Sequence, residues 1–243
     1  MKKFGLIGFP LSHSFSKKYF SDKFLKENIQ GVEYESYPLE DISDLLSLLV
    51  REPLLAGLNV TIPYKEKVIP YLDDLSDEVK QIGACNCIAI QGSKLKGYNT
   101  DVIGFEISLM KKLKSHHQQA LVLGTGGAAK AVHYVLAKNG ISFLKISRTP
   151  GDDQLSYESL TKEIIESHQL IVNTTPLGMY PDINSFPPIP YEHLGNQHYL
   201  FDLVYNPDKT MFLLRGEKRG AEIENGADML IDQAEASWDI WMG

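Results

Sequence analysis

The sequence has little cysteine, no long apolar run and no excess of basic residues. Among 243 residues only two are Cys, and 31 Asp and Glu against 24 Lys and Arg give a formal net charge of −7. A disulfide framework is therefore excluded, and so are collagen-like and disordered chains, because 43% of the residues are apolar and 10% are aromatic. No window approaches the roughly 18 uncharged apolar residues of a membrane span.

These absences also limit the expected partners and compartment. A nucleic-acid partner would require a basic stripe, and none is visible in this acidic chain. The N-terminal segment, residues 1–8, has two lysines but no long apolar region or small-residue cleavage site, so it reads as a first strand rather than a signal peptide. We expect a cytoplasmic protein with no membrane or nucleic-acid partner, and a length that allows one large domain or two small ones.

The two cysteines lie close together in an apolar run. Cys85 and Cys87 are two residues apart, where a strand would place both on one face. A metal site would need further soft ligands, and no histidine falls at a suitable spacing. We interpret them as two reduced thiols that pack in the core, with no metal bound.

Apolar runs bounded by turn residues alternate with helical patterns, which is typical of α/β proteins with a mainly parallel sheet. Strands are predicted near residues 4–8, 32–37, 57–62, 85–90, 120–123, 143–147, 170–173 and 199–204. Helices are predicted at residues 16–29, 42–50, 102–114, 128–139, 158–167 and 227–241. From residue 120 onward the series resembles a nucleotide-binding sheet.

A glycine turn joins one of these strands to a helix. Gly124, Gly126 and Ala129 match the pattern G-x-G-x-x-A, with an apolar strand before it and a helical pattern after it. In this context, backbone N–H groups and the helix N-terminus can bind a pyrophosphate. The alternative is a tight turn without a ligand.

The end of the next strand indicates which dinucleotide binds. About twenty residues after the glycine turn, an Asp or Glu would bind the ribose of NAD, whereas this chain has Ser147-Arg148-Thr149. A guanidinium can offer two N–H groups to a 2′-phosphate, which an acidic residue would repel. We therefore predict NADP, the alternative being an exposed arginine at a strand end.

A second polar set lies in the first half of the chain. Asn59 and Thr61 alternate with apolar residues at the end of a predicted strand, and Lys65 follows one turn later. Asp101 closes the segment 97–101 just before a helix. Open α/β sheets bind ligands at such positions, although Lys65 alone could be a solvated lysine and Asp101 a helix cap.

Taken together, these segments resemble the shikimate dehydrogenase family nearly from end to end. The matching segments are residues 8–16, 59–65, 82–86, 97–101, 124–129, 147–149, 173–179, 202–207 and 226–234. The resemblance implies an N-terminal α/β substrate domain over residues 1–101, a Rossmann-like NADP-binding domain over residues 102–225, and a C-terminal helix, 226–243, that packs back on the first domain.

The implied activity is the reversible NADPH-dependent reduction of 3-dehydroshikimate to shikimate, a step toward chorismate and the aromatic amino acids. In the family, the lysine that matches Lys65 handles the proton at the reacting oxygen, and the aspartate that matches Asp101 pairs with it. Hydride arriving at a carbonyl carbon builds negative charge on the oxygen, which requires a positioned donor. The protein is expected as a monomer or homodimer.

The resemblance also implies which residues surround the ligands. For the substrate carboxylate and ring hydroxyls, these are Ser14, Ser16, Asn59, Thr61, Asn86, Tyr205 and Gln233. For NADP, they are Gly124, Gly126, Gly127, Ala128, Ala129, Ser147, Arg148, Thr149, Thr174, Leu203, Gly226 and Met229. Neutral donors and acceptors discriminate hydroxyl patterns well, because a wrong ligand leaves buried groups unpaired.

The chain departs from the family pattern at a few positions. Lys17-Lys18 stands where a proline usually follows the serine motif, Ser147 replaces the commoner asparagine, and Cys87 replaces a threonine. Two other functions stay open: a dehydrogenase that also uses quinate or tolerates NAD, and a catalytically silent ligand sensor. Retention of both Lys65 and Asp101 argues against the sensor, which needs a pocket but no proton-transfer pair.

Overall fold

The chain of the computed structural model, described over residues 1–11 and 15–243, folds into two units. The first consists of Met1–Thr100 and Gln233–Gly243, and the second of Asp101–Asp232. Each has a six-stranded sheet and its own core.

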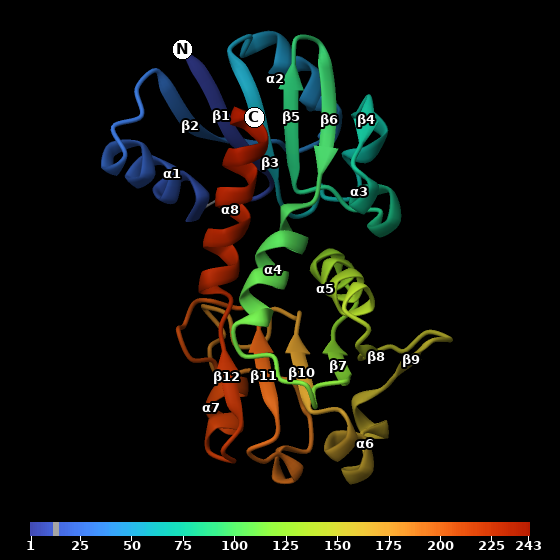
Figure 1. Ribbon diagram of the computed structural model, residues 1–243. Helices are drawn as coiled ribbons and strands as arrows, with labels where there is room; N and C mark the ends of the chain where they lie inside the picture. The colour runs from blue at the N-terminus through green and yellow to red at the C-terminus, as the bar shows by residue number, and fades with distance from the viewer. Residues whose placement is uncertain (12–14) are drawn as a thin grey trace. The chain divides into compact units, whose positions relative to one another are not determined.

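The sheet of the first unit is mixed, with the strand order β2-β1-β3-β5-β6-β4 (Figure 1). Its strands are β1 (Lys2–Gly8), β2 (Val32–Pro38), β3 (Leu55–Val60), β4 (Asp74–Leu75), β5 (Cys87–Gln91) and β6 (Lys94–Tyr98). β2 and β3 run parallel to β1, whereas β5 is antiparallel to both β3 and β6. The hairpin between β5 and β6 turns at Gly92, whose φ of 63° favours glycine.

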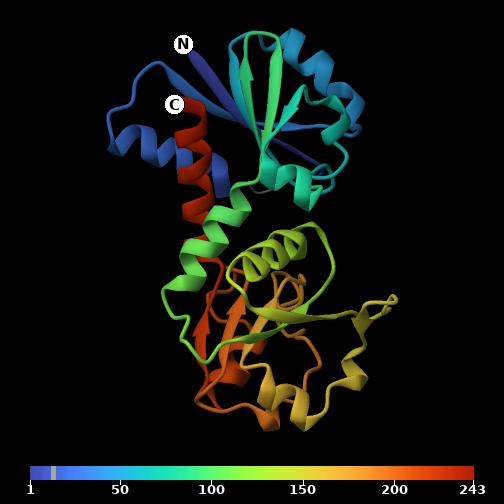
Figure 2. The same ribbon diagram turned by 45° about the vertical axis from the view of Figure 1, so that its right-hand side comes forward.

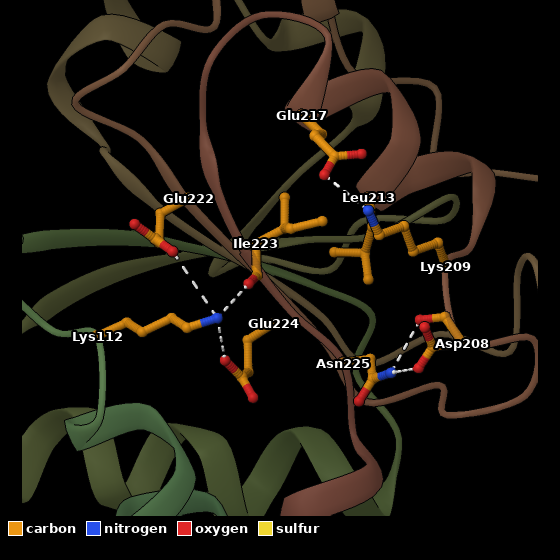
Figure 3. A pocket seen from close by; sticks show the side chains of 9 residues that line it. All are labelled: Lys112, Asp208, Lys209, Leu213, Glu217, Glu222, Ile223, Glu224 and Asn225. Atoms are coloured by element: carbon orange, nitrogen blue, oxygen red, sulfur yellow. Dashed lines mark hydrogen bonds and ion pairs between the residues drawn. The ribbon is translucent and has the colours of Figure 1, made fainter.

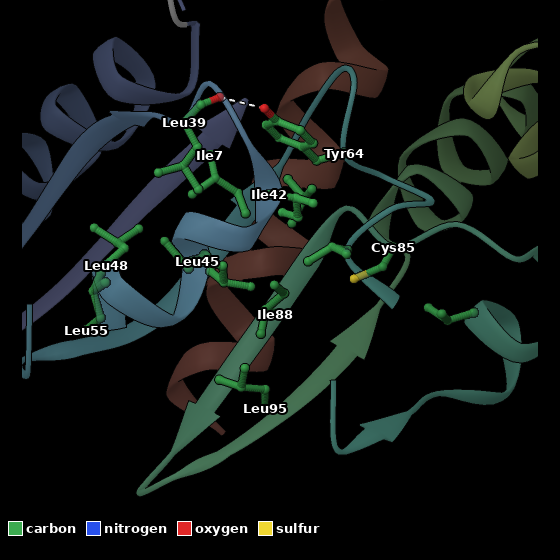
Figure 4. Close-up of a cluster of buried hydrophobic side chains, with 14 residues drawn as sticks. Ile7, Leu39, Ile42, Leu45, Leu48, Leu55, Tyr64, Cys85, Ile88 and Leu95 are labelled. Carbon is green, nitrogen blue, oxygen red and sulfur yellow. Dashed lines mark hydrogen bonds between the residues drawn. The ribbon is translucent and has the colours of Figure 1, made fainter. Parts of the chain in front are cut away.

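Helices cover both faces of this sheet. They are α1 (Phe15–Lys26), α2 (Leu45–Arg51), α3 (Asp77–Ile82) and the C-terminal part of α8 (Ala227–Met242), with short 3-10 turns η1 (Ile42–Asp44) and η2 (Ile69–Tyr71). In both ribbon views α1 and the C-terminal part of α8 lie on one side and α2 on the other (Figures 1 and 2). On the α2 side, Leu45 and Leu48 pack with Leu58 and Ile88, and the Tyr64 hydroxyl donates to the carbonyl oxygen of Leu39 at 2.6 Å (Figure 4).

The opposite face is an aromatic cluster that the end of the chain completes. Trp241 stacks on Phe4 with ring centroids 4.9 Å apart, and Trp238 lies 5.4 Å from the same ring. The Trp241 indole N–H donates to the carbonyl oxygen of Ile88 at 3.0 Å. A Cβ at Gly57 would lie 2.2 Å from this indole nitrogen, so only glycine lets the ring approach the sheet.

The sheet of the second unit is entirely parallel, with the strand order β12-β11-β10-β7-β8-β9. Its strands are β7 (Gln119–Leu123), β8 (Ser142–Ile146), β9 (Gln154–Leu155), β10 (Leu170–Asn173), β11 (Tyr199–Asp202) and β12 (Glu222–Glu224). The order reverses between β7 and β10, and open α/β sheets bind ligands outside the carboxyl ends of the strands at such a reversal.

Helices again cover both faces. They are α4 (Thr100–Met110), α5 (Gly127–Lys138), α6 (Lys162–Ser167) and α7 (Met211–Glu217), with short turns η3 (Tyr157–Ser159) and η4 (Tyr191–His193). Ile165 of α6 and Phe212 of α7 pack in one core with Leu121 and Leu200 of the sheet. Phe105 of α4 contacts Phe201 edge to face at 5.1 Å. The predicted α/β class, with a Rossmann-like domain, is confirmed.

The structure corrects two expectations. Cys85 and Cys87 are both buried, unbridged thiols, but they do not share a face. β5 begins only at Cys87, so strand alternation does not extend to Cys85, which packs in the α2-side core while Cys87 packs in the aromatic cluster. Strand β6 was not predicted, so the first sheet contains a β5–β6 hairpin and two antiparallel pairings beside its three parallel ones.

The division between the units falls at 100/101 and, inside α8, at 232/233. The first turn of α8 is tied to the second unit, since Asp228 pairs with Lys111 at 2.6 Å. Within the described ranges, no helix is both long and apolar enough to cross a membrane, and no three His, Cys, Asp or Glu side chains gather as metal ligands would.

Candidate active site

The carboxyl edge of the parallel sheet carries the glycine turn. Gly124 directly follows β7 with φ of 104°, and a Cβ there would lie 2.7 Å from Thr174 Oγ1 and 2.9 Å from Thr175 Cγ2. Gly126 is the N-cap of α5, and a Cβ at Gly126 or Gly127 would meet no atom within 4 Å. This combination leaves the first N–H groups of α5 open toward a ligand, as a bound pyrophosphate requires.

The loop after β8 places the predicted phosphate-binding residues at the same edge. Ser147 Oγ donates to the carbonyl oxygen of Thr149 at 3.1 Å and accepts from the Thr149 N–H at 3.2 Å, which closes a tight turn around Arg148. Arg148 is exposed. The serine in this position therefore shapes the loop and leaves the guanidinium available to an anion.

A cavity of about 270 Å³ joins the glycine turn to this loop. Its lining includes the predicted residues Gly124, Gly126, Ser147, Arg148 and Thr174. Arg148 is the only charged side chain in its described lining, so the pocket suits a group that is anionic at one end. The cavity and its glycine cradle fit a dinucleotide phosphate.

Further residues of the cavity were not predicted: Thr125, Ile146, Tyr157, Thr175, Pro176 and Leu177. Thr175 to Leu177 belong to the segment 173–179, in which only Thr174 was predicted to contact NADP. Tyr157 carried no local signal, because it reaches the cavity from η3, which packs beside the sheet. Burial raises the pKa of the Tyr157 phenol to about 12.

The other predicted cofactor residues lie outside the lining of this cavity. Leu203 directly follows β11, and Gly226 is packed against it so closely that a Cβ would lie 2.2 Å from the Leu203 carbonyl oxygen. Ala129 is buried at the start of α5, and Met229 is buried in α8. Gly127 and Ala128 form the first residues of α5, and Thr149 is exposed beyond Arg148.

In the first unit, the predicted substrate residues Asn59 and Asn86 belong to one buried network of amides and hydroxyls. Asn59 Oδ1 accepts from the Tyr34 hydroxyl at 2.8 Å, and its Nδ2 donates to Ser237 Oγ at 2.9 Å. Asn86 Nδ2 donates to Thr100 Oγ1 at 3.0 Å, and Thr100 Oγ1 lies 3.1 Å from Ser237 Oγ. The network thereby joins strands β2 and β3, the residue before β5, the first residue of α4 and helix α8.

Other predicted substrate residues lie in or beside this network. Gln233 is 7% exposed, and its backbone carbonyl oxygen accepts from Ser237 Oγ at 2.9 Å. The Ser16 hydroxyl interacts with the Tyr34 phenol, whose pKa is strongly raised by burial. Thr61 directly follows β3, and its N–H donates to the carbonyl oxygen of Ile7 at 2.9 Å.

Three members of the network were not predicted: Tyr34, Thr100 and Ser237. No local pattern marks them, because their roles depend on contacts between distant segments. Ser14, a predicted ligand of the substrate carboxylate, lies outside the described residues.

Lys65 is half-buried in the turn that follows β3, and its carbonyl oxygen accepts from the Cys85 N–H at 2.7 Å. This bond holds the Lys65 backbone beside the residue that precedes Asn86. Asp101 is 8% exposed in the first turn of α4, directly after Thr100 of the network. Tyr205 is 41% exposed in the loop after β11 of the second unit.

A second cavity of about 300 Å³ in the second unit contains none of the predicted residues (Figure 3). The ammonium of Lys112 lies between Glu222 and Glu224, at 3.8 and 2.6 Å, and also donates to the carbonyl oxygen of Ile223 at 2.8 Å. It thereby covers the outer strand of the sheet with a charge, as proteins do to protect sheet edges.

Comparison with known proteins identifies relatives along the whole chain. Residues 6–88 match the family model of the shikimate dehydrogenase substrate binding domain. A shikimate dehydrogenase (NADP(+)) of Clostridium beijerinckii is 39% identical over 99% of this chain and 92% of its own length, and one of Caldanaerobacter subterraneus subsp. tengcongensis is 36% identical over 100% and 92%. The crystal structure of shikimate 5-dehydrogenase from Thermus thermophilus, in complex with NADP(H) and shikimate, has a TM-score of 0.88 and 29% identity, and covers 100% of this chain and 94% of that one.

The second unit has a parallel sheet with a glycine turn and an arginine at its carboxyl edge, and the first is a mixed α/β unit with a polar network. Together they define a two-domain, nicotinamide-dependent dehydrogenase. The relatives extend over both units at more than 30% identity. The chain belongs to the shikimate dehydrogenase family.

Proposed function

We propose that this protein catalyses the reversible, NADPH-dependent reduction of 3-dehydroshikimate to shikimate. The single observation that carries the proposal is the cavity that joins Gly124 and Gly126 to Arg148, in a chain whose relatives are NADP(+)-dependent shikimate dehydrogenases. NADPH, when bound, would supply the hydride.

The cofactor is held by backbone N–H groups and by one cationic side chain, that of Arg148. The N–H groups at the start of α5 receive the pyrophosphate, and Arg148 receives the 2′-phosphate with two N–H groups. Thr174, Leu203 and Gly226 each lie after a strand of the second sheet, where they would contact the adenine or nicotinamide end of the cofactor. Support comes from the parallel sheet, which brings the carboxyl ends of five strands to one edge.

The substrate is held by neutral groups of the first unit. Ser14 and Ser16 bind the carboxylate, and Asn59, Thr61, Asn86 and Gln233 surround the ring hydroxyls, with Tyr205 from the loop after β11. The network around Ser237 supports this assignment, because it fixes the two asparagine amides in one orientation each. Amides fixed in this way discriminate between hydroxyl patterns, because a ring hydroxyl must match the donor and acceptor positions that the network leaves to it.

Lys65 is the catalytic acid and base. In the direction of reduction, its ammonium donates a proton to the carbonyl oxygen as negative charge develops there, and in the reverse direction its amine accepts that proton. Asp101 pairs with the lysine and orients its side chain. The Cys85 N–H, which holds the Lys65 carbonyl oxygen at 2.7 Å, fixes the turn from which the side chain extends.

The activity is tested by following NADPH absorbance after shikimate is mixed with NADP. We expect turnover, and we expect Lys65→Ala to lower kcat by roughly 10²- to 10⁴-fold while NADPH binding is retained. Lys67→Ala, which removes an exposed lysine from the same turn, is the matched control and should keep its kcat. Unchanged turnover in Lys65→Ala would remove Lys65 from the catalytic role.

The same assay separates the alternatives. Comparable kcat/KM values for quinate and shikimate, or for NAD and NADP, would indicate the broader dehydrogenase. Binding of NADPH and shikimate without any turnover would indicate a ligand sensor. We further propose a cytoplasmic location, which the two buried, unbridged thiols support.

A further inference from the structure

A carboxyl group that the proposed reaction does not use lies beneath the cofactor edge of the second unit. Asp202 ends β11 and Asn173 ends the neighbouring strand β10 (Figure 1), and the two residues are directly opposite in the strand register. Both side chains are fully buried. Burying a carboxylate is costly unless donors surround it, so its surroundings indicate what it stabilises.

Asp202 accepts three hydrogen bonds from three different segments. Asn173 Nδ2 and the Val204 N–H donate to Oδ1 at 2.9 and 3.0 Å. Thr210 Oγ1 donates to Oδ2 at 2.5 Å, and this hydroxyl is also the N-cap of α7, since it accepts from the Leu213 N–H at 3.4 Å. One carboxylate therefore joins the end of β10, the loop after β11 and the start of α7.

Asn173 extends the connection to the loop that lines the phosphate cavity. Its Oδ1 accepts from the Thr175 N–H at 3.0 Å and from Thr175 Oγ1 at 2.7 Å. Thr174, between them, donates through its N–H and its Oγ1 to the carbonyl oxygen of Leu123, at 2.9 and 2.7 Å, and so lies against Gly124. The Asn173 side chain thus holds Thr175 directly, and Thr174 is fixed between this contact and the carbonyl oxygen of Leu123.

The other arm leads to the loops after β11 and β12. The N–H of Val204 is held by Asp202, and the Val204 carbonyl oxygen accepts from the Gly226 N–H at 3.3 Å. The Leu203 N–H donates to the Asn173 carbonyl oxygen at 3.0 Å, and Gly226 packs on Leu203. The pair of Asp202 and Asn173 is therefore connected to the segments that follow β7, β10, β11 and β12.

We propose that Asp202 is a positioning residue for the cofactor: through Asn173 and Val204 it sets the relative positions of the loops that carry Thr174, Leu203 and Gly226. The proposal rests on the proposed function, because these loops are assigned to NADP there. A purely structural buried carboxylate would affect unfolding alone, whereas a positioning residue affects the affinity for NADPH in the folded protein.

The test measures NADPH binding by fluorescence titration, well below the unfolding temperature, and the KM values for NADP and shikimate. Asp202→Ala should raise the Kd for NADPH about tenfold or more, as expected when two loops lose a shared charged acceptor, and should change the KM for shikimate less than about twofold. Asp202→Asn should regain most of this affinity, because the amide oxygen still accepts from Asn173 and Val204 while the amide nitrogen donates to Thr210.

His198→Ala is the matched control. His198 is a buried polar residue just before β11, at the opposite end of the strand, where it contacts the carbonyl oxygen of Ile165 at 3.0 Å and the Gly195 N–H at 3.0 Å. Its loss should lower the unfolding temperature and leave the Kd for NADPH unchanged. Wild-type affinity in Asp202→Ala, or an equal loss of affinity in His198→Ala, would overturn the proposal.

If Asp202→Ala does not fold, Thr175 gives a second test. Thr175→Val keeps the shape and the backbone N–H bond to Asn173 but loses the bond from the hydroxyl, whereas Thr175→Ser keeps both. The valine variant should therefore bind NADPH at least about fivefold more weakly than the serine variant. Equal affinities would overturn the proposal. Because binding is measured without turnover, a wild-type protein that binds NADPH but does not oxidise shikimate would contradict the proposed function alone.

Discussion

Replacing Arg148 with alanine should remove most of the preference for NADP over NAD. Arg148 lies at the rim of the 270 Å³ cavity and is the only charged side chain in its described lining. A hydrogen bond to a charged group contributes about 1.5 to 3 kcal/mol, or about 10- to 150-fold in affinity. Because Arg148 is exposed, solvent and salt screen the contact, and we expect about 10- to 30-fold weaker NADPH binding.

The assay compares Kd values for NADPH and NADH by fluorescence titration, and KM values for NADP and NAD with shikimate. NADH lacks the 2′-phosphate, so its Kd should change by less than about threefold in Arg148→Ala. Lys145→Ala is the control: it removes the same charge from β8, the strand that precedes the Arg148 loop, where the ammonium pairs with Asp153 at 2.5 Å. Equal losses for both cofactors in Arg148→Ala, or a similar NADPH loss in Lys145→Ala, would refute the assignment.

Three further predictions concern stability. Gly124→Ala should lower the free energy of unfolding by about 1–3 kcal/mol, because φ is positive and the Cβ meets Thr174, whereas Gly126→Ala should change it by less than about 0.5 kcal/mol in urea titrations. His133 stacks on Phe143 with Nε2 buried and without a hydrogen-bond partner among the described residues, and burial lowers its pKa to about 4. The neutral form of His133 is favoured by folding, so the stability of the wild-type protein should fall as the pH drops from about 6.5 to about 4. His133→Phe should therefore increase the free energy of unfolding more at pH 5 than at pH 8. An equal increase at both pH values would contradict this. Burial raises the pKa of Asp202 to about 6, so its protonated form is favoured by folding. The stability of the wild-type protein should therefore fall as the pH rises from about 4 to about 6, by up to roughly 3 kcal/mol relative to Asp202→Asn. Parallel pH profiles of the two proteins would exclude the shift.

Much of the second unit could be predicted from local sequence. The strand before Gly124, the helix after Gly126 and the arginine after the next strand all lie within 30 residues, 119–148. Each follows from short-range rules of apolar periodicity and glycine turns. Parallel strands then place Ser147, Thr174 and the glycine turn at one edge without further information. The cavity contains these predicted residues for that reason.

The first unit was less predictable because its contacts join distant segments. Its place at a strand end predicted Asn59 as a ligand-binding residue, but its hydrogen-bond partners Tyr34 and Ser237 lie 25 and 178 residues away in the chain. Strand β6 was not predicted, and neither were the antiparallel pairings of β5 with β3 and β6. Cys85 was assigned to a strand that begins two residues later, so its face was wrong.

The sequence by itself determined the family, the α/β class and the chemical character of the site: a glycine turn, one arginine and a set of neutral amides and hydroxyls. These are properties of residue type and short spacing, and they can be read along the chain. Only the tertiary structure decided which groups are joined. It placed Tyr157 in the cavity, divided α8 between the two units, and buried Asp202 beneath four loops of the cofactor edge. Burial and hydrogen bonding between segments far apart in the chain depend on how sheets and helices pack, and no local pattern encodes that packing.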